Sequence, residues 1–247
     1  MNGMWDQGII LNSHTYNAVT NRLCKEGKSE RAWELFSLML KRNVFPGIAT
    51  YSTLIDAFAK LSNFEKALML YNGMLKCGVV PDKVMYTILI NICRHRDNIY
   101  EAYDWFKEMI QENLIPDEIS YTSIIAVFCK FQNMKKAEEL FNEMLLQGYL
   151  PNVRTYTCLV DGYCKKNRMD KANMWFDRMI RAKVTPDVVI YNVLIAAYRR
   201  FGNLDRAHEL FREMNEKGIS PNKVTFSILG LDGSVAKKVQ EAEEAMQ

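Results

Sequence analysis

Residues 50–82 read TYSTLIDAFAKLSNFEKALMLYNGMLKCGVVPD, and residues 155–187 read TYTCLVDGYCKKNRMDKANMWFDRMIRAKVTPD. The two stretches align without a gap, from the first Thr-Tyr to the final Pro-Asp. Self-similarity at a fixed spacing indicates a repeat architecture. Every proline of the chain obeys the same 35-residue spacing. These prolines are Pro46, Pro81, Pro116, Pro151, Pro186 and Pro221.

A numbering that places proline at position 34 divides the chain into repeats. The complete repeats are 13–47, 48–82, 83–117, 118–152, 153–187 and 188–222. Residues 1–12 resemble the tail of an earlier repeat. Residues 223–247 begin a seventh repeat and end in an amphipathic segment, which we expect to form a capping helix over the last repeat.

Each repeat carries the pattern of two helices. Apolar residues at positions 4, 7, 8 and 11 follow the i, i+3, i+4, i+7 spacing of one helix face, and positions 20, 23, 24 and 27 do the same. Polar residues near positions 14–16 are expected to make the turn, and proline at position 34 ends the second helix. One helix pair cannot bury its own apolar face, so neighbouring pairs must stack. The predicted fold is all-α, an α-solenoid of 35-residue helix–turn–helix repeats.

The composition excludes several classes of protein. The formal net charge of +3 neither demands nor excludes a nucleic-acid partner. No apolar run reaches the roughly 18 residues that a membrane helix needs. The six cysteines form no C-x-x-C pair, so we expect buried thiols rather than disulfides or a metal site. The three histidines occupy different repeat positions, and we expect no cofactor.

Three polar columns lie off the apolar stripes and are candidates for function. Position 5 is always small and hydrogen-bonding: Asn17, Ser52, Thr87, Thr122, Thr157 and Asn192. Position 35 is Gly47, Asp82, Asp117, Asn152, Asp187 and Asn222. Position 13 is Lys25, Lys60, His95, Lys130, Lys165 and Arg200. In stacked repeats, these columns become parallel rows on one wall.

The chemistry of the rows suits a single nucleic-acid strand. A row of cations can follow a phosphate backbone, and positions 5 and 35 can read the Watson–Crick edge of an unpaired base. An ionised Asp only accepts hydrogen bonds, whereas Asn also donates. Position 2 is often aliphatic and can pack on base faces, as in Val84, Ile119, Val189 and Val224. Three simpler roles compete: a helix cap at position 35, a polar filler at position 5, and a cation that complements the helix dipole at position 13.

The two quoted stretches resemble pentatricopeptide repeats of the plain 35-residue P class. The resemblance implies a right-handed superhelix that binds single-stranded RNA, one base per repeat, 5′ to 3′ from the N-terminus. Its base-reading positions are 5 and 35, and position 2 sandwiches the bases. His14, Ala49 and Arg154 replace the usual aliphatic residue at position 2. The tetratricopeptide family is the nearest rival, but its period is about 34 residues.

The resemblance also implies a base for each repeat. Ser52/Asp82, Thr87/Asp117 and Thr157/Asp187 each imply G, and Thr122/Asn152 implies A. Asn192/Asn222 implies C, with U second, and Asn17/Gly47 implies a pyrimidine. The expected core is 5′-(Y)GGAG(C/U)-3′.

The resemblance implies action in organellar RNA stability, processing, splicing or translation, in a mitochondrion rather than a chloroplast. Other RNA-processing proteins are expected partners, and a membrane or small-molecule substrate is not. No catalytic constellation or zinc-deaminase signature stands out, so we expect no enzyme activity. Two alternatives stay open: a protein-binding helical-repeat scaffold, and an inactive fragment of a longer repeat protein.

Overall fold

The computed structural model describes residues 12–230. The predicted tail up to residue 11 and the predicted last helix lie outside this range. The described part divides into two compact units that meet between Pro116 and Asp117, and each is considered by itself. The boundary falls one residue before a predicted repeat boundary.

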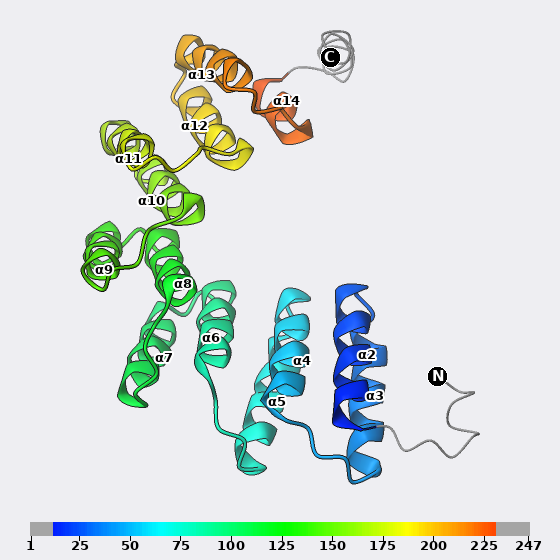
Figure 1. Cartoon of the computed structure of the whole chain (residues 1–247). Coiled ribbons are helices and arrows are strands. Elements are labelled where there is room, and N and C mark those ends of the chain that lie inside the picture. Colours follow the sequence, from blue (N-terminus) through cyan, green and yellow to red (C-terminus); the bar gives the residue numbers. More distant parts are fainter. Residues whose placement is uncertain (1–11, 231–247) are drawn as a thin grey trace. The chain divides into compact units, whose positions relative to one another are not determined.

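Unit 1 contains three consecutive helical hairpins (Figure 1). Its helices are α2 (Ser13–Lys25), α3 (Ser29–Lys41), α4 (Ile48–Lys60), α5 (Phe64–Lys76), α6 (Lys83–His95) and α7 (Ile99–Gln111). The first helices of successive repeats, α2, α4 and α6, contact one another, and each also packs on the second helix of its own repeat.

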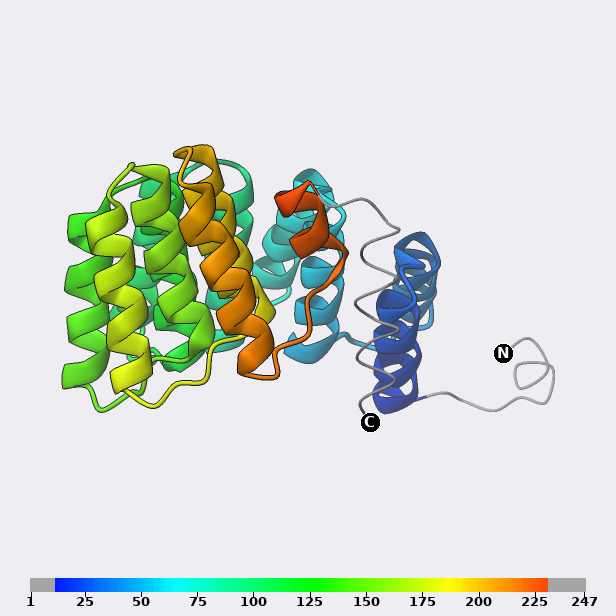
Figure 2. The same cartoon turned by 90° about the horizontal axis from the view of Figure 1, so that it is seen from above.

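Unit 2 continues the pattern with three hairpins and a final short helix (Figure 2). Its helices are α8 (Glu118–Lys130), α9 (Met134–Leu146), α10 (Val153–Lys165), α11 (Met169–Arg181), α12 (Val188–Arg200), α13 (Leu204–Glu216) and α14 (Lys223–Leu229). Helices α8, α10, α12 and α14 form one layer, and α9, α11 and α13 form the other. Each unit is a stack of helical hairpins, which confirms the all-α repeat solenoid. The right-handed superhelix stays a prediction.

The predicted core positions are buried. In the repeat 48–82, Leu54, Ile55 and Phe58 are fully buried between the layers. In the repeat 118–152, the ring of Phe141 lies 4.8 Å from that of Trp175 in the next repeat, edge to face. Such contacts tie each hairpin to its neighbour, because an aromatic pair contributes about 0.5–1.5 kcal/mol beyond its buried area.

Two residues of each complete repeat adopt the left-handed backbone conformation. One stands at position 15, between the two helices, and the other at position 31, after the second helix. Five of these twelve are glycines: Gly27, Gly78, Gly148, Gly202 and Gly218. The other seven are Asn43, Ser62, Asp97, Asn113, Gln132, Asn167 and Lys183. The backbone geometry of the turn is therefore constant, although the residue is not.

Burial of the cysteines is only partly as predicted. All six are free thiols, and Cys93, Cys129 and Cys164 are buried. Burial raises the pKa of Cys93 and of Cys164 to about 12, which makes both poor nucleophiles. Cys77 is exposed, contrary to the prediction, because it follows the last turn of α5. Among residues 12–230, no helix is long and apolar enough to cross a membrane.

Candidate functional site

The residue at position 35 is the N-cap of the next first helix. Its side-chain Oδ1 accepts hydrogen bonds from backbone N–H groups of the first turn. The Oδ1 of Asp82 lies 2.9 Å from the amide nitrogen of Met85, and that of Asp187 lies 3.0 Å from the amide nitrogens of Val189 and Ile190. The helix-cap role that competed with base reading is therefore real.

Capping uses only part of each position 35 side chain. In Asp82 and Asp187, Oδ2 accepts no hydrogen bond from the described residues. An Asp side chain thus keeps an acceptor after capping, and an Asn side chain keeps its NH₂ donor. Position 35 can cap the helix and contact a ligand at the same time.

Gly47 is the exception at position 35, because it has no side chain to cap α4. The hydroxyl of Thr50 in the first turn of α4 donates instead to Oδ1 of Asn17 in the preceding repeat. Asn17 therefore has its oxygen engaged, which leaves its NH₂ group as the donor of this repeat.

Position 5 lies beside the cap of the next repeat. In unit 2, Nδ2 of Asn192 is 3.3 Å from Oδ1 of Asn222. The Oγ1 atoms of Thr122 and Thr155, the latter in the first turn of α10, are 2.8 Å apart. These bonds place positions 5 and 35 of one repeat side by side. The pair Thr87/Asp117 is divided between the two units and stays a sequence prediction.

Two position 5 side chains hold buried polar atoms that have no hydrogen-bond partner among the described residues. They are Oγ of Ser52 and Oδ1 of Asn192, and Asn192 as a residue is only 8% exposed. A buried polar atom without a partner is costly, so it calls for an explanation such as a bound ligand. By contrast, Thr87 and Thr157 donate to the backbone carbonyls of Lys83 and Val153.

Position 2 exposes aliphatic side chains next to these polar atoms. Val84, Ile119, Val189 and Val224 are 51%, 64%, 52% and 55% exposed. Each lies in the first turn of a helix, three residues before the residue at position 5. The repeats thus place polar atoms that can contact the edge of a base beside apolar side chains that can cover the ring of a base.

The position 13 residues lie at the opposite end of the same helices. Each first helix of a complete repeat ends on its position 13 residue, eight residues after position 5. At 1.5 Å per residue, the two positions are about 12 Å apart along the helix axis. The cations therefore complement the C-terminal helix dipole, as the simpler interpretation proposed. They are also too far from position 5 to share a base contact with it.

Several position 13 side chains already have partners. Lys60 pairs with Asp56 at 2.5 Å, and Lys165 pairs with Asp161 at 2.6 Å. Arg200 donates to the carbonyl of Cys164, 2.5 Å away at the end of α10. The ring of His95 stacks on that of Phe64, and Lys130 lies over the ring of Phe131. Lys25 is exposed at the end of α2.

Sequence reasoning missed the residues that engage these side chains. Asp56 and Asp161 stand at position 9, four residues before their lysines, a spacing that favours an ion pair on a helix. Thr50 and Thr155 stand at position 3 and contact position 5 of the preceding repeat. The i, i+4 spacing could have revealed the ion pairs, whereas the contacts across repeats required the stacking.

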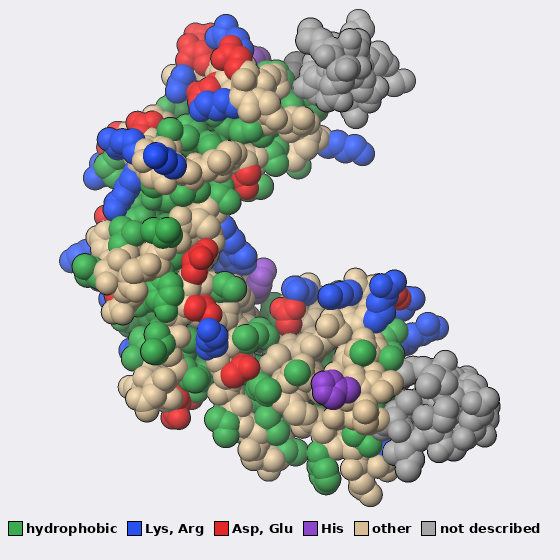
Figure 3. Space-filling model, in the orientation of Figure 1, with side chains coloured by type: hydrophobic (Ala, Val, Ile, Leu, Met, Phe, Trp, Pro, Cys, Tyr) green, Lys and Arg blue, Asp and Glu red, His purple; other side chains and the backbone are tan. Residues whose placement is uncertain are grey.

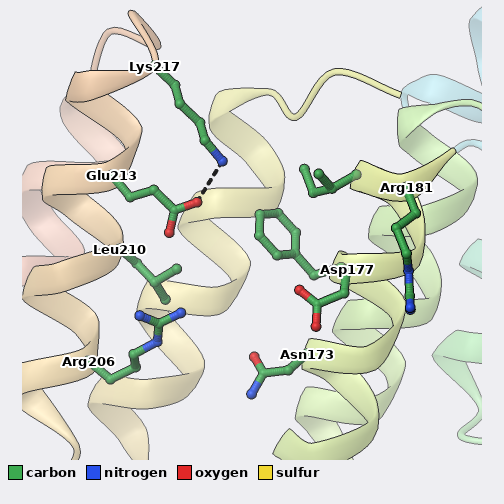
Figure 4. Close-up of a pocket in the computed structure, with 9 residues that line it drawn as sticks. Asn173, Asp177, Arg181, Arg206, Leu210, Glu213 and Lys217 are labelled. Carbon is green, nitrogen blue, oxygen red and sulfur yellow. Dashed lines mark hydrogen bonds and ion pairs between the residues drawn. The ribbon is translucent and has the colours of Figure 1, made fainter. Parts of the chain in front are cut away.

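A separate groove lies between second helices in unit 2 (Figure 4). It has a volume of about 650 Å³, an apolar floor of Phe176, Ile180 and Leu210, and a charged rim. Glu213 pairs with Lys217 at 2.7 Å on this rim. Lys and Arg side chains are interspersed with Asp and Glu over α11 and α13, so no single charge dominates (Figure 3). Within the described ranges, no group of side chains could hold a metal ion.

The fold and the recurrent polar pairs define a helical-repeat protein that presents one pair per repeat. Residues 66–229 match the pentacotripeptide-repeat region of PRORP, residues 11–60 the PPR repeat family, and residues 49–79 the PPR repeat. Because the first match covers more than half of the chain, the chain belongs to the pentatricopeptide repeat family. No curated protein matches it.

Solved structures with the same fold include RNA complexes. The pentatricopeptide repeat protein PPR10 from maize has a TM-score of 0.68 and 27% identity, covering 89% of this chain and 31% of PPR10. PPR10 in complex with an 18-nucleotide psaJ RNA element has a TM-score of 0.56 and 23% identity, covering 97% and 39%. This chain thus spans between about 30% and 40% of the length of PPR10.

More distant structures share the fold alone. The PPR domain of Arabidopsis thaliana protein-only RNase P 1, in complex with tRNA, has a TM-score of 0.58 and 22% identity, covering 74% of this chain and 96% of that one. A tetratricopeptide repeat protein from Parabacteroides merdae has a TM-score of 0.65 and 15% identity, covering 88% and 83%.

Proposed function

We propose that the chain binds single-stranded RNA and reads one base with each pair of positions 5 and 35. The observation that carries the proposal is the buried, partnerless Oδ1 of Asn192 beside the cap residue Asn222 and the exposed Val189 and Val224. The Watson–Crick edge of an unpaired base offers the hydrogen bonds that such atoms lack. The RNA bound to PPR10 and the tRNA bound to the PPR domain of the RNase P protein support RNA as the ligand.

The polar atoms left over from capping favour particular bases. Asp82 and Asp187 keep an acceptor, which suits the N1–H and N2–H donors of guanine. The NH₂ groups of Asn152 and Asn222 suit a ring acceptor, N1 of adenine or N3 of cytosine. With G also assigned to Thr87/Asp117 and a pyrimidine to Asn17/Gly47, the proposed core is 5′-(Y)GGAG(C/U)-3′.

The position 13 cations attract the strand without reading it. Their ion pairs are solvent-exposed, with 74% of the Lys60 side chain exposed, so a phosphate can compete with Asp56 for Lys60. We propose binding alone and no catalytic step. From the family resemblance, we also propose a role in the stability, processing, splicing or translation of organellar transcripts, in a mitochondrion rather than a chloroplast.

Fluorescence anisotropy with a labelled RNA centred on UGGAGC tests the proposal. The controls are a scrambled RNA and the same sequence as DNA, each over a salt series. We expect preferential binding of the first RNA, with a log–log salt slope near −4 if about six phosphates are contacted. RNA binding that is blind to sequence would refute the base assignments. Failure of a folded, helical sample to bind any RNA would refute the function and favour the protein scaffold or the inactive fragment.

The groove between α11 and α13 is the observation that bears on the scaffold alternative. Its residues belong to the second helices, whereas positions 2, 5 and 35 belong to the first helices and their caps. A protein partner in this groove would therefore leave the proposed RNA-binding rows uncovered.

A further inference from the structure

The repeat 118–152 contains a chain of hydrogen bonds that runs through the buried hydroxyl of Thr155. Thr155 stands at position 3 of the next repeat and is completely buried. Its Oγ1 lies 3.2 Å from Oδ1 of Asn152 and 2.8 Å from Oγ1 of Thr122. The hydroxyl thus joins the position 35 and position 5 residues of this repeat.

The orientation of the Asn152 amide is fixed from two sides. The backbone N–H of Thr155 needs an acceptor, and Oδ1 of Asn152 provides it at 3.0 Å. The carboxylate of Glu118 can only accept, and Nδ2 of Asn152 donates to it at 2.5 Å. One hydrogen of the NH₂ group is therefore spent on Glu118, and the second is left for a ligand.

The direction of the remaining bonds follows from counting protons. Thr155 has a single hydroxyl proton, and the acceptor-only Oδ1 of Asn152 takes it. The bond between Thr155 and Thr122 must then be donated by Thr122. Thr122 has spent its own proton on the protein, so it offers a ligand lone pairs alone.

We propose that Thr155 is a positioning residue for base specificity, because it makes the repeat 118–152 present one donor and one acceptor. The donor is the second N–H of Asn152, and the acceptor is Oγ1 of Thr122. Adenine offers the complement, an acceptor at N1 and a donor at the exocyclic N6. Guanine offers a donor at N1 and an acceptor at O6. Its N1–H would therefore face the N–H donor of Asn152, and no hydrogen bond could form between them. This inference rests on the proposed RNA-binding function.

Other repeats show which residues replace the hydroxyl. After Asn222, Thr225 again stands at position 3, with its Oγ1 3.2 Å from the Oδ1 of that cap. After Asp82 and Asp187, position 3 is the apolar Met85 and Ile190. The position 5 residues of those two repeats, Ser52 and Thr157, make no bond across the repeat boundary in the described structure. Ser120 after Asp117 also carries a hydroxyl, which donates to Oδ1 of that cap, so the choice between A and G depends on the cap residue as well as on the hydroxyl.

The test is the substitution Thr155→Val in the full chain, which keeps the shape and removes the hydroxyl. Anisotropy is measured with UGGAGC and with the same RNA carrying G, C or U at the fourth nucleotide. We expect the preference for A over G to fall about five- to tenfold, the effect of losing one oriented hydrogen bond. Thr155→Ser should retain the preference, because it restores the donor.

The matched control is Ile190→Val, a change at the same buried position of a repeat that has no hydroxyl there. It should leave the preferences at both the fourth and the fifth nucleotide unchanged. Thermal melting followed by circular dichroism verifies folding. If Thr155→Val does not fold, Thr122→Val at the other end of the bond chain must show the same loss of A-over-G preference.

Two results would overturn the inference and are distinguishable. An unchanged ratio of A to G affinity in folded Thr155→Val, with RNA still bound, would reject the role of Thr155 and leave the proposed function intact. A wild-type chain that binds none of the four RNAs would reject the proposed function and this inference with it.

Discussion

The repeats 48–82 and 118–152 have the same backbone and different polar contacts. The cap residue Asp82 has φ −105° and ψ 177°, and Asn152 has φ −93° and ψ 177°. Yet Oγ of Ser52 has no hydrogen-bond partner in the described structure, whereas Thr122 bonds to Thr155. The comparison shows that the apolar columns determine the hairpin, while the residues at the helix N-terminus can change without disturbing it.

A reciprocal exchange at position 35 should have the largest effect on this comparison. Asp82→Asn should move the preference of the second nucleotide from G to A, and Asn152→Asp should move that of the fourth from A to G. Each exchange inverts a donor and an acceptor, so we expect a change of about tenfold or more in the affinity ratio. Anisotropy with RNAs that carry A or G at those nucleotides measures it.

The exchange has an internal control, since each variant should leave the preference at the other nucleotide unaltered. Equal binding of both RNAs by both variants would show that position 35 is only a helix cap. The stability of Asp82→Asn should hardly change, because Asp and Asn are nearly equivalent at an N-cap. Asn152→Asp should be less stable, because it loses the hydrogen bond to Glu118 and places two carboxylates next to each other.

The tyrosines at position 4 should make the two repeats differ in alkaline solution. The pKa of Tyr51 is raised to about 12, mainly by burial and secondly by the thiol of Cys77. The pKa of Tyr121 is raised more than that of Tyr51, mainly by burial and secondly by the hydrogen bond to Glu143. A raised pKa stabilises the fold fully below the unfolded value of about 10, and this stability is lost as pH rises through the folded value.

We therefore expect the melting temperature to fall between about pH 10 and pH 12, measured by circular dichroism. Tyr121→Phe removes one ionisable group and the 2.9 Å bond to Glu143. It should cost about 1 kcal/mol at neutral pH and weaken the alkaline fall. Tyr51→Phe loses only a 3.8 Å contact to sulfur, so its neutral-pH cost should be smaller. A melting temperature constant up to pH 12 would contradict this account.

The smallest expected effect concerns the cations. Lys60 pairs with Asp56, and Lys165 pairs with Asp161, in each case four residues apart on one helix. Asp56→Asn should release Lys60 and strengthen RNA binding about two- to threefold, in line with the strength of an exposed ion pair. Asp161→Asn should act on Lys165 in the same way and by a similar factor. Both differences should shrink in concentrated salt, and a salt-independent change would point to altered folding instead.

The sequence predicts the core well and the polar site only in part. The core follows from a local rule, because Leu54, Ile55 and Phe58 occupy one helix face whatever surrounds the helix. The direction of the bonds at Asn152 depends on Glu118 and Thr155, and the contact between Thr155 and Thr122 spans a repeat boundary. Such contacts arise only when helices stack, so no single-helix pattern reveals them. The exposure of Cys77 could have been predicted, because the same position after the second helix is polar in other repeats, as in Arg42, Gln147 and Lys217.

The left-handed turns at positions 15 and 31 have a consequence for exchange of segments between related genes. Residues as different as Gly148 and Lys183 close the same turn at position 31. If two related genes recombine at this position, the joined backbones already have the same local conformation, so the junction requires no new loop. A single inserted residue at that point would instead rotate every following helix face. Recombination that keeps whole 35-residue segments can therefore shuffle the polar pairs while leaving the packing of each hairpin intact.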